Sequence, residues 1–419
     1  MKLNKPENEN YAAVVCRIKN IVPLEGSDNI VGTPLLGYQA IVSKDTNIGD
    51  IGIVFPAETQ LSEEYVKENN LFRHAELNKD TKKSGYIEDN RRVKAMKFRG
   101  NRSDALFMPL DSLKYTKVNL SELEEGNVFD ELNGRKICQK YYVKRPVSRV
   151  EKNKVKKFVR VDSKYLPEHY DSDNYFRNMD AIKPNQEIIV TQKLHGTSIR
   201  IGNTIVKRKL KWHEVIAQKL GVKVQETEFD YVFGSRKVIK DPNNPNQNHF
   251  YETDIWTDEG KKLEGLVPEN FLVYGELIGW TKDGAPIQKG YTYQVPRETA
   301  DLYIYRVAVV NNQGRVVDLT WSQVVEFCKD TGLRPVPELW RGLMKDFKAE
   351  DWLDKNFREE GYVEAVPLAK ESPCDEGVCI RVDGLAPYIL KAKSPEFLAH
   401  ETKMLDEEAV DLEAEGSVA

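Results

Sequence analysis

The 419-residue sequence has few of the residues that build disulfide frameworks or zinc sites. Its five cysteines are scattered, none of them forms a Cys-x-x-Cys pair, and its six histidines are equally dispersed. Paired cysteines at short spacing are typical of zinc sites, and even, regularly spaced sets are typical of secreted disulfide domains. We therefore expect reduced structural thiols, with neither a disulfide framework nor a zinc site.

Long hydrophobic runs are also missing. The first residues, Met1 to Glu7, have no apolar core of signal-peptide length, and no later stretch is long enough to cross a bilayer. The sequence therefore predicts a cytoplasmic protein with no membrane partner. Its length is enough for two or three domains with full cores.

The net charge is only −4, but charges of one sign are segregated along the chain. Between Arg135 and Arg160 there are eleven Lys or Arg and one acid, Glu151, whereas Glu396 to Glu415 holds eight acids and one lysine. The acidic end is typical of a solvated tail. The basic run favours a polyanionic partner, because neutralising phosphates drives sequence-independent nucleic-acid binding.

The first part of the chain has the pattern of an all-β module. Short apolar runs alternate with turn residues at 12–16, 38–42, 51–55 and 105–108, which favours a small barrel. A short helix is expected from 62 to 70, with Ser62 as its N-cap. A basic cluster then follows, interleaved with apolar residues so that several cations would share one strand face; it comprises Arg91, Arg92, Lys94, Lys97, Arg99 and Arg102.

The second part mixes strands and helices. Apolar β-rich runs at 271–277 and 302–310 predict buried strands, and helices are expected at 211–220, 322–329 and, as an acidic amphipathic helix, 398–412. Residues 241–264 are rich in Asn, Pro and acids and are interpreted as an excursion away from the core.

The stretch around which the chain is organised is Gln192-Lys193-Leu194-His195-Gly196-Thr197-Ser198. It follows the apolar run 188–190, so it is interpreted as a strand end and a tight turn. Partial desolvation at a strand end favours the neutral amine that a nucleophilic lysine needs. Gly196, which has no Cβ, would let the backbone turn sharply and approach a phosphate closely.

Later segments place further functional side chains on strands. Glu276 follows Tyr274-Gly275, and Tyr303 and Tyr305 alternate with apolar neighbours, so both should face one side. Glu376 stands just before a short apolar strand, and Lys391 and Lys393 occupy one face of another. These are the acids, aromatics and cations that a lysine attacking a nucleoside triphosphate requires.

Two families are indicated by these motifs. The ordered segments 49–50, 53–58, 92–95, 98–100 and 108–110, together with 137–143, resemble the N-terminal OB-like module of the Deinococcus-type RNA ligases. The motifs from Lys193 onward resemble those of covalent nucleotidyltransferases, the superfamily of ATP-dependent ligases and capping guanylyltransferases. The resemblance implies an α+β chain: an OB-like β-barrel (1–130), a basic connector (131–180) and a ligase domain of antiparallel sheets flanked by helices (181–419).

The resemblance also implies the role of each site residue. Lys193 would accept the nucleotide, Glu276 would contact the ribose, and Tyr305 or, by strand register, Tyr303 would stack on the adenine. Glu376 would be linked to the metal, Mg²⁺ or Mn²⁺, and the α-phosphate would lie against Lys391 and Lys393. Further nucleotide contacts are expected from Gln192, Leu194, His195, Gly196 and Arg236. RNA contacts are expected from Arg92, Lys94, Arg99, Lys140, Lys144 and Arg145.

His195 favours an RNA ligase, since DNA ligases usually carry aspartate there. Only 26 residues follow Lys393, too few for the C-terminal OB domain of DNA ligases and capping enzymes. We expect a monomeric ATP-dependent RNA-repair ligase that acts on RNA or an RNA-containing nicked duplex. A capping-type guanylyltransferase and a non-catalytic RNA-binding protein remain alternatives. Two positions depart from the family pattern: Ser198, where some RNA ligases have asparagine, and Arg306, where many relatives have aspartate.

Overall fold

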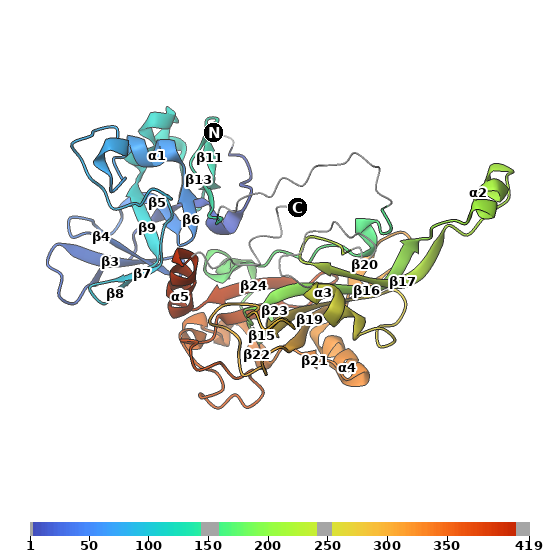
Figure 1. Cartoon of the computed structure of the whole chain (residues 1–419). Coiled ribbons are helices and arrows are strands. Elements are labelled where there is room, and N and C mark those ends of the chain that lie inside the picture. The colour runs from blue at the N-terminus through green and yellow to red at the C-terminus, as the bar shows by residue number, and fades with distance from the viewer. Residues whose placement is uncertain (1–2, 144–158, 241–253, 408–419) are drawn as a thin grey trace. The chain divides into compact units, whose positions relative to one another are not determined.

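The computed structural model describes residues 3–143, 159–240 and 254–407. The chain divides into two units (Figure 1). Unit 1 comprises Met1–Val143, Asp173–Ala181 and Ala392–Ala409, and unit 2 comprises Lys144–Ser172, Ile182–Lys391 and Val410–Ala419. The strands β1–β14 and the helices α1 and α5 belong to unit 1, and β15–β23 and α2–α4 belong to unit 2.

Unit 1 is built mainly from short strands. Its largest sheet has the order β10-β1-β5-β9-β4-β3-β2. The elements of unit 1 are β1 (Ala13–Arg17), β2 (Val22–Pro23), β3 (Ile30–Leu35), β4 (Tyr38–Ser43), β5 (Ile51–Pro56), β6 (Thr59–Leu61), α1 (Glu63–Glu68), β7 (Met96–Phe98), β8 (Asn101–Ser103), β9 (Ala105–Pro109), β10 (Val128–Phe129), β11 (Glu131–Leu132), β12 (Arg135–Lys136), β13 (Cys138–Lys140), β14 (Asp173–Asn174) and α5 (Pro395–Asp406). Within the described residues no pairing joins the edge strands β10 and β2, so the predicted closed barrel is not shown.

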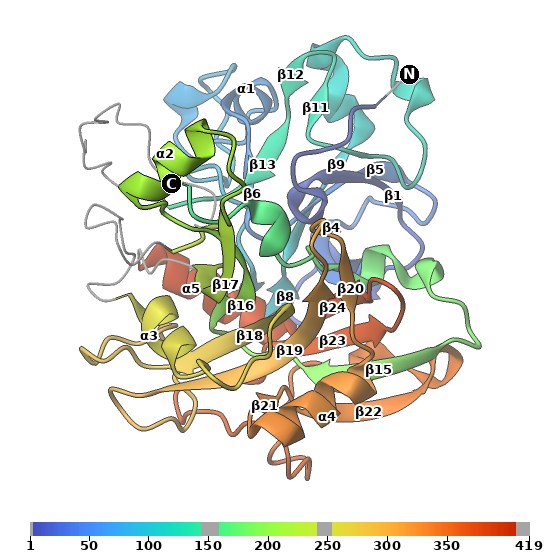
Figure 2. The ribbon, with the colours of Figure 1, turned by 90° about the vertical axis from the view of Figure 1, so that its right-hand side faces the viewer.

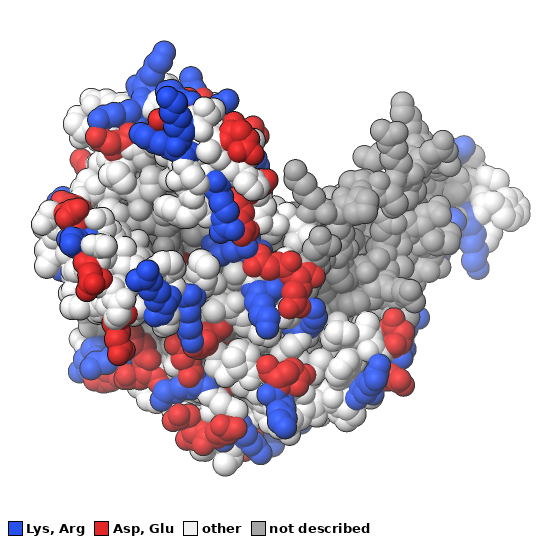
Figure 3. Space-filling model, turned by 60° about the vertical axis from the view of Figure 1, so that its left-hand side comes forward, with Lys and Arg blue, Asp and Glu red and all other residues white. Residues whose placement is uncertain are grey.

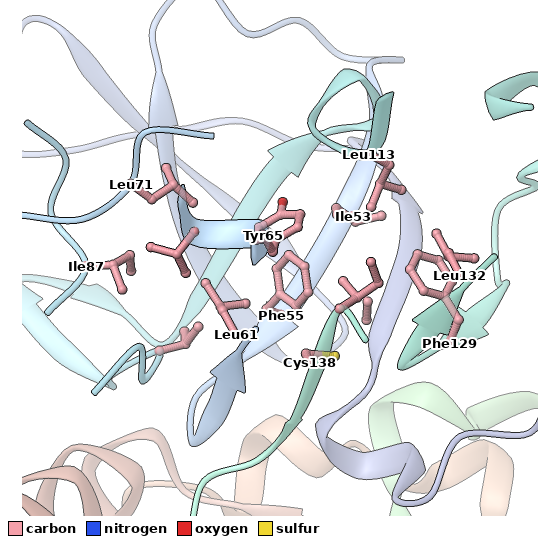
Figure 4. Packing of buried hydrophobic residues seen from close by; sticks show 14 of the residues in the cluster. Ile53, Phe55, Leu61, Tyr65, Leu71, Ile87, Leu113, Phe129, Leu132 and Cys138 are labelled. Atoms are coloured by element: carbon pink, nitrogen blue, oxygen red, sulfur yellow. The ribbon is translucent and has the colours of Figure 1, made fainter. Parts of the chain in front are cut away.

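Strand β5 lies in the interior of this sheet and is apolar throughout, and buried clusters cover both of its faces. Ile53 and Phe55 belong to a core on one face, and Val54 belongs to a smaller cluster on the other. Figure 4 shows the larger core, in which the ring of Tyr65 from α1 packs edge-on against Phe55, with 5.2 Å between ring centroids. The N-cap of α1 is Ser62, as predicted, and its hydroxyl accepts a hydrogen bond from the backbone N–H of Tyr65.

The C-terminal helix α5 belongs to unit 1, although the sequence predicted it as part of the ligase domain. Thr402 connects it to two distant segments: its hydroxyl donates to Glu58 at 2.7 Å and accepts from the backbone N–H of Ala95 at 3.0 Å. Burial raises the pKa of Glu58 to about 7. Residues 408–412 of the predicted acidic helix lie outside the described residues.

The expectation that Arg92 contacts RNA is wrong, because its side chain is buried in unit 1. Arg92 is 2% exposed and donates to the backbone carbonyl of Thr402 at 2.8 Å and to Asp406 at 2.9 Å. The alternating pattern predicted an exposed strand face. Between Arg91 and Arg99, however, only residues 96–98 form a strand. Arg99 is exposed and has φ +49°, followed by Gly100 with φ +81°, the two central positions of the β7–β8 hairpin turn.

Unit 2 contains two antiparallel sheets (Figure 2), one with the order β17-β16-β18-β19-β20 and one with the order β24-β23-β15-β22. Strand β21 adds to β19 in parallel. The elements are β15 (Glu187–Gln192), β16 (Thr197–Lys207), α2 (Trp212–Lys219), β17 (Thr227–Ser235), α3 (Ile255–Lys261), β18 (Phe271–Gly279), β19 (Ala300–Val310), β20 (Val316–Asp318), α4 (Trp321–Thr331), β21 (Arg334–Pro335), β22 (Glu338–Leu343), β23 (Gly377–Val382) and β24 (Tyr388–Lys393), the last of which ends in unit 1.

The predicted helices 211–220 and 322–329 and the two predicted buried strands are confirmed with small shifts in their ends. The interpretation of 241–264 as an excursion is wrong for its second half, and 241–253 lie outside the described residues. Helix α3 packs on β16 and β17, and Trp256 is buried with its indole N–H donating to the carbonyl of Ser198 at 3.1 Å. No helix in the described ranges is long and apolar enough to cross a membrane.

Candidate active site

Lys193 begins the four-residue connection between β15 and β16, which belong to different sheets. The backbone N–H of Gln192 donates to the carbonyl of Pro337 at 2.9 Å, and that of Lys193 donates to the carbonyl of Gly377 at 3.0 Å. The strand-like pairing of β15 with its neighbours therefore continues up to the lysine. This places the Lys193 side chain at a strand end, as predicted.

The amine of Lys193 faces the carboxylate of Glu376. Its Nζ lies 2.8 Å from Glu376 Oε2, and the side chains are 10% and 0% exposed. Glu376 immediately precedes β23, the neighbour of β15, so strand pairing brings together two residues 183 positions apart. The same carboxylate oxygen lies 3.7 Å from Nδ1 of His195. The structure thus brings two predicted site residues, Lys193 and His195, to the carboxylate of a third, Glu376.

Asp375 holds the residue before the lysine. Its Oδ1 accepts a hydrogen bond from Gln192 Nε2 at 2.7 Å, and its Oδ2 accepts one from the backbone N–H of Phe357 at 2.7 Å. The Gln192 amide also exchanges two hydrogen bonds with the backbone of Val366. Burial raises the pKa of Asp375 to about 6. No sequence motif assigned a role to Asp375.

The turn after Lys193 is clamped by side chains that sequence reasoning missed. The backbone N–H of His195 donates to the hydroxyl of Tyr293 at 2.7 Å, and the carbonyl of Gly196 accepts from Gln288 Nε2 at 2.8 Å. Both partners lie in the irregular segment between β18 and β19, which carries no motif. The backbone N–H of Gly196 donates to Glu276 Oε1 at 3.1 Å.

Glycine was expected at position 196 so that the backbone could approach a phosphate, but the structure shows that it is required by a close approach to the protein's own backbone. A Cβ there would lie 2.1 Å from the backbone oxygen of Leu277 and 2.9 Å from the side chain of Ile278. The close neighbour is therefore strand β18 of the protein itself. Because β18 also carries Glu276, the close packing of Gly196 helps to place this acid beside the turn.

An open cavity lies beside these residues, entirely within unit 2, and its empty space, including the part open to solvent, is about 800 Å³. Seven of the predicted nucleotide-site residues line it: Gln192, Lys193, Leu194, Arg236, Glu276, Tyr305 and Lys391. His195 and Gly196 are not among its lining residues and lie in the turn described above. Lys393 belongs to unit 1, where its Nζ lies 3.4 Å from Glu401.

Tyr305, rather than Tyr303, lines the cavity. The pairing of β18 with β19 shifts between Tyr274 and Gly275, so that Tyr305 is an extra residue in the ladder, a β-bulge. Tyr303 is paired with Glu276 in the ladder, but its ring lies under the guanidinium of Arg334 at 4.8 Å. The bulge therefore distinguishes two tyrosines that the alternating pattern could not separate.

Because of the bulge, the side chain of Arg306 also points to the buried side of the sheet. Arg306 is fully buried, donates to Asp318 at 3.3 Å through Nη2, and lies 4.0 Å from the ring centroid of Tyr170 and 4.2 Å from that of Tyr274. The hydroxyl of Tyr170 donates to Asp318 at 2.9 Å. Arg306, which departs from the family pattern, thus supports the aromatic wall of the cavity.

The segment that carries His169 and Tyr170 was not predicted as part of the site. Both residues line the cavity, and the ring centroid of His169 is 4.7 Å from that of Tyr305. The segment is held by its backbone: the carbonyl of Leu166 accepts from Arg200 at 2.8 Å, and the carbonyl of Pro167 accepts from Tyr274 at 3.0 Å. No short motif marks these residues in the sequence.

The predicted cationic residues have acidic neighbours. Arg236 lines the cavity and donates to Asp171 at 2.6 Å. In unit 1, Lys94 lies 2.6 Å from Glu88 and 3.0 Å from Asp406. Figure 3 likewise shows Lys and Arg side chains close to Asp and Glu on the face that it draws. Lys140 lies over the ring of Tyr11 at 5.0 Å, and Lys144 and Arg145 lie outside the described residues.

Residues 186–393 match the family model described as RNA ligase. The match contains Lys193, Glu276, Tyr305, Glu376 and Lys391, so the motifs from which an RNA ligase was predicted lie inside the matched segment. No curated protein matched the sequence.

Solved structures with the same fold include RNA ligases from Naegleria gruberi. One, with pyrophosphate, is 17% identical with a TM-score of 0.58 and covers 94% of this chain and 99% of its own. A variant with ATP and Mn is 17% identical with a TM-score of 0.59, covering 93% and 99%, and another with AMP and Mn is 15% identical with a TM-score of 0.56, covering 93% and 98%. The α+β arrangement of both units is therefore shared with these proteins.

Proposed function

We propose that this chain is an ATP-dependent RNA ligase in which Lys193 is the covalent nucleotide acceptor. The observation that carries this proposal is the buried contact of the Lys193 amine with Glu376 beside the cavity, inside the segment that matches the RNA ligase family. The Naegleria gruberi ligases with ATP or AMP support the choice of nucleotide. Their fold is the one that this chain has.

In the first step the neutral amine of Lys193 attacks the α-phosphorus of ATP. A nitrogen–phosphorus bond forms, the bond from the α-phosphorus to the bridging oxygen breaks, pyrophosphate leaves, and the amine loses a proton. The ion pair with Glu376 favours the ammonium form, so the pair must loosen before attack. Lys391, which also lines the cavity, would neutralise charge on the α-phosphate.

Two further transfers complete the reaction. The 5′-phosphate of the broken strand attacks the α-phosphorus, which releases Lys193 and gives an adenylylated 5′ end. The RNA 3′-hydroxyl then attacks the 5′-phosphate, a phosphodiester forms, and AMP leaves. Tyr305 would stack on the adenine, and Glu276, whose Oε1 holds the Gly196 N–H, would contact the ribose.

A divalent cation fits the carboxylate of Glu376. No group of three or more His, Cys, Asp or Glu side chains suited to a metal occurs in the described part of the chain. Mg²⁺ is commonly held by one or two carboxylates together with substrate phosphates and water. Mg²⁺ or Mn²⁺ at Glu376 would supply charge neutralisation for the phosphates. The Naegleria gruberi structures with Mn support a divalent cation as the cofactor.

Unit 1 is proposed as the RNA-binding module, of the OB-like kind found in Deinococcus-type RNA ligases. Its candidate contacts are Lys94, Arg99 and Lys140, followed by Lys144 and Arg145 in the basic connector. We propose a monomer that repairs RNA or RNA-containing nicked duplexes in the cytoplasm. A nicked duplex with RNA at the 3′-hydroxyl end should be sealed, and sealing should weaken with salt.

The proposal is tested by incubating the protein with α-labelled ATP and Mg²⁺ or Mn²⁺. A covalent AMP adduct should form on the wild type and be absent from Lys193→Ala. Lys370→Ala, an exposed lysine of the same unit, is the matched control and should keep the adduct. A label that survives in Lys193→Ala, or that comes from GTP and not from ATP, would contradict the proposal.

A further inference from the structure

Strands β16 and β17 extend into an arm that ends in α2. They pair continuously from Ile199↔Ser235 to Lys207↔Thr227, and the intervening residues 208–226 carry the helix. Figure 1 shows α2 at the end of these two strands, away from the sheets of unit 2. We refer to residues 207–227 as the arm. It follows directly from the strand that begins after the Lys193 turn.

Helix α2 has no buried residue. It is held mainly at its start, where Glu214 accepts from Arg208 Nη2 at 2.6 Å and from the backbone N–H of Lys211 at 2.7 Å. An isolated helix of this length is only marginally stable in water. The side-chain interactions of the arm therefore fix the start of the helix, and no residue of the helix is buried.

The helix presents large apolar side chains to solvent. Trp212 and Leu220 are each 77% exposed, and Ile216 is 48% exposed. Tryptophan is highly buried on average in folded proteins, so a side chain exposed to this extent at the tip of an arm indicates a contact surface.

The surroundings of Trp212 are strongly basic. The arm carries six Lys or Arg (Lys207, Arg208, Lys209, Lys211, Lys219 and Lys223) and two acids, Glu214 and Glu226. Glu214 is paired with Arg208, so it does not offset the five lysines. An exposed aromatic ring among lysines is the combination with which proteins hold single-stranded nucleic acid, the ring stacking on a base and the amines lying along the phosphates.

We propose that the arm is a second RNA-binding site, in which Trp212 stacks on a base and Lys209, Lys211, Lys219 and Lys223 contact phosphates. This inference rests on the proposed function, since it assumes that the substrate is RNA. It extends that function, because the arm would bind the part of the RNA strand that lies far from the end being joined. The charge of the arm favours RNA over an apolar protein partner, because a buried protein interface is depleted of lysine.

The length of β16 sets the distance at which the arm acts. Ten residue steps from Thr197 to Lys207, at about 3.3 Å each, span about 33 Å. That corresponds to about ten nucleotides at about 3.4 Å per nucleotide of a stacked strand. The arm should therefore contribute only when the RNA extends about ten nucleotides or more from the reacting end.

The main experiment compares Trp212→Ala with wild type in binding and sealing of 5′-phosphorylated RNA of about 24 and about 6 nucleotides. The Kd for the long RNA should rise about tenfold and the Kd for the short RNA should stay unchanged, because one base loses its stacking partner. Trp212→Phe, which keeps an aromatic face, should restore most of the binding. Leu220→Ala, an equally exposed apolar residue, is the matched control. Equal Kd values for wild type and Trp212→Ala on the long RNA would overturn the proposal.

A second variant tests the lysines. Changing Lys209, Lys211, Lys219 and Lys223 to Gln should reduce the slope of log Kd against log salt by about 3, at about 0.7 for each phosphate contact of a single strand. Lys345→Gln with Lys348→Gln, exposed lysines elsewhere in unit 2, should leave the slope unchanged. An equal slope in wild type and the arm variant would contradict the phosphate contacts.

Adduct formation on Lys193 separates this proposal from the proposed function. The arm variants should form the covalent AMP adduct at the wild-type rate, which also shows that unit 2 is folded. If the wild type forms no adduct, the proposed function fails, whatever the arm binds. If the wild type self-associates in sedimentation and Trp212→Ala does not, the arm is a protein contact and the RNA proposal is overturned.

Discussion

Lys193 and Glu376 form a buried ion pair that must change before the lysine can act as a nucleophile. A carboxylate 2.8 Å from the amine stabilises the ammonium, and both side chains are largely shielded from solvent. ATP and a divalent cation both bring charges that compete for these two groups. Glu376 therefore both positions the Lys193 amine and keeps it in the unreactive ammonium form.

Replacing Glu376 by Gln should make the Lys193 amine more reactive before any nucleotide is attached. Without the carboxylate the ammonium loses its charged partner, so at a fixed pH near 8 a larger fraction is neutral. Modification by an amine-reactive reagent, followed at Lys193 by peptide mass spectrometry without ATP or metal, should be faster in the variant. Lys370 serves as the internal control. Adduct formation from ATP should nevertheless fall, because the carboxylate proposed to hold the cation is lost.

Gly196→Ala should destabilise unit 2 by about 2 kcal/mol or more, since the added Cβ would lie 2.1 Å from the carbonyl oxygen of Leu277. Urea unfolding followed by tryptophan fluorescence measures the change. Gly384→Ala is the control: it lies in an exposed loop, and the nearest atom to its added Cβ is 3.1 Å away. Equal losses for the two variants would show that the close approach at Gly196 is unimportant.

Asp375 should make the stability of the protein depend on pH. Burial raises its pKa from 3.8 to about 6, so the native state binds this proton more tightly than the unfolded state. Its contribution to stability is present below pH 4 and is lost as pH rises to about 6, by about 3 kcal/mol at 1.36 kcal/mol per pKa unit. Asp375→Asn should remove this fall. Between pH 4 and 6 the free energy of unfolding of the wild type should decrease relative to that of the variant. Parallel curves would contradict the assignment.

At the scale of elements, the bulge in β19 links the cavity wall to a buried ion pair. Arg306 and Asp318 lie on neighbouring strands, with side chains 1% and 0% exposed, and Asp318 also accepts the hydroxyl of Tyr170. A buried pair is costly to break from one side, because the remaining charge is left without a partner. Replacing both residues of the pair by apolar residues of similar volume lowers the free energy of unfolding much less.

Asp318→Leu should therefore lower the free energy of unfolding by about 3 to 5 kcal/mol, and Arg306→Met with Asp318→Leu should lower it by less. A double-mutant cycle with Arg306→Met, measured by urea unfolding, gives the coupling energy. Because Tyr170 loses its acceptor in both Asp318 variants, the Kd for ATP should rise in each. Additive losses across the cycle would show that the two residues do not act as a pair.

At the scale of the whole molecule, the C-terminal helix α5 packs in the unit that the first 143 residues form. Thr402 of α5 bonds both Glu58 and the backbone of Ala95, more than 300 positions away. Arg92 is buried in the same place by Thr402 and Asp406. The last helix therefore completes the fold of the first unit.

Thr402→Val should destabilise unit 1 by about 1 to 3 kcal/mol, since two buried groups lose their hydrogen-bond partner. Burial raises the pKa of Glu58 to about 7, so its carboxylate is largely ionised only above that pH, where the Thr402 hydroxyl stabilises the charge. The loss of Tm should accordingly be larger at pH 8.5 than at pH 6. Lys403→Ala, exposed on the same helix, should change the Tm little at either pH.

The identity of the reactive groups could be predicted from the sequence because each sits in a local pattern. Lys193 follows an apolar strand, Glu376 precedes one, and Tyr305 and Lys391 alternate with apolar neighbours. Such patterns depend only on neighbouring residues. Strand pairing then brings Lys193, Tyr305 and Lys391 to one cavity, with Glu376 in contact with the lysine. The choice between Tyr303 and Tyr305 could not be made in this way, because both face the same side until a bulge separates them.

The sequence by itself determined which residues are the candidates for the chemistry and most of the strands and helices that hold them. Only the tertiary structure decided what surrounds them: that Gly196 packs on β18, that Tyr293, Gln288 and Asp375 hold the lysine turn, and that Arg92 is buried. The physical reason is distance along the chain. Periodicity reports which face of an element is apolar, whereas the partner of a buried polar group is chosen by the packing of segments far apart in sequence.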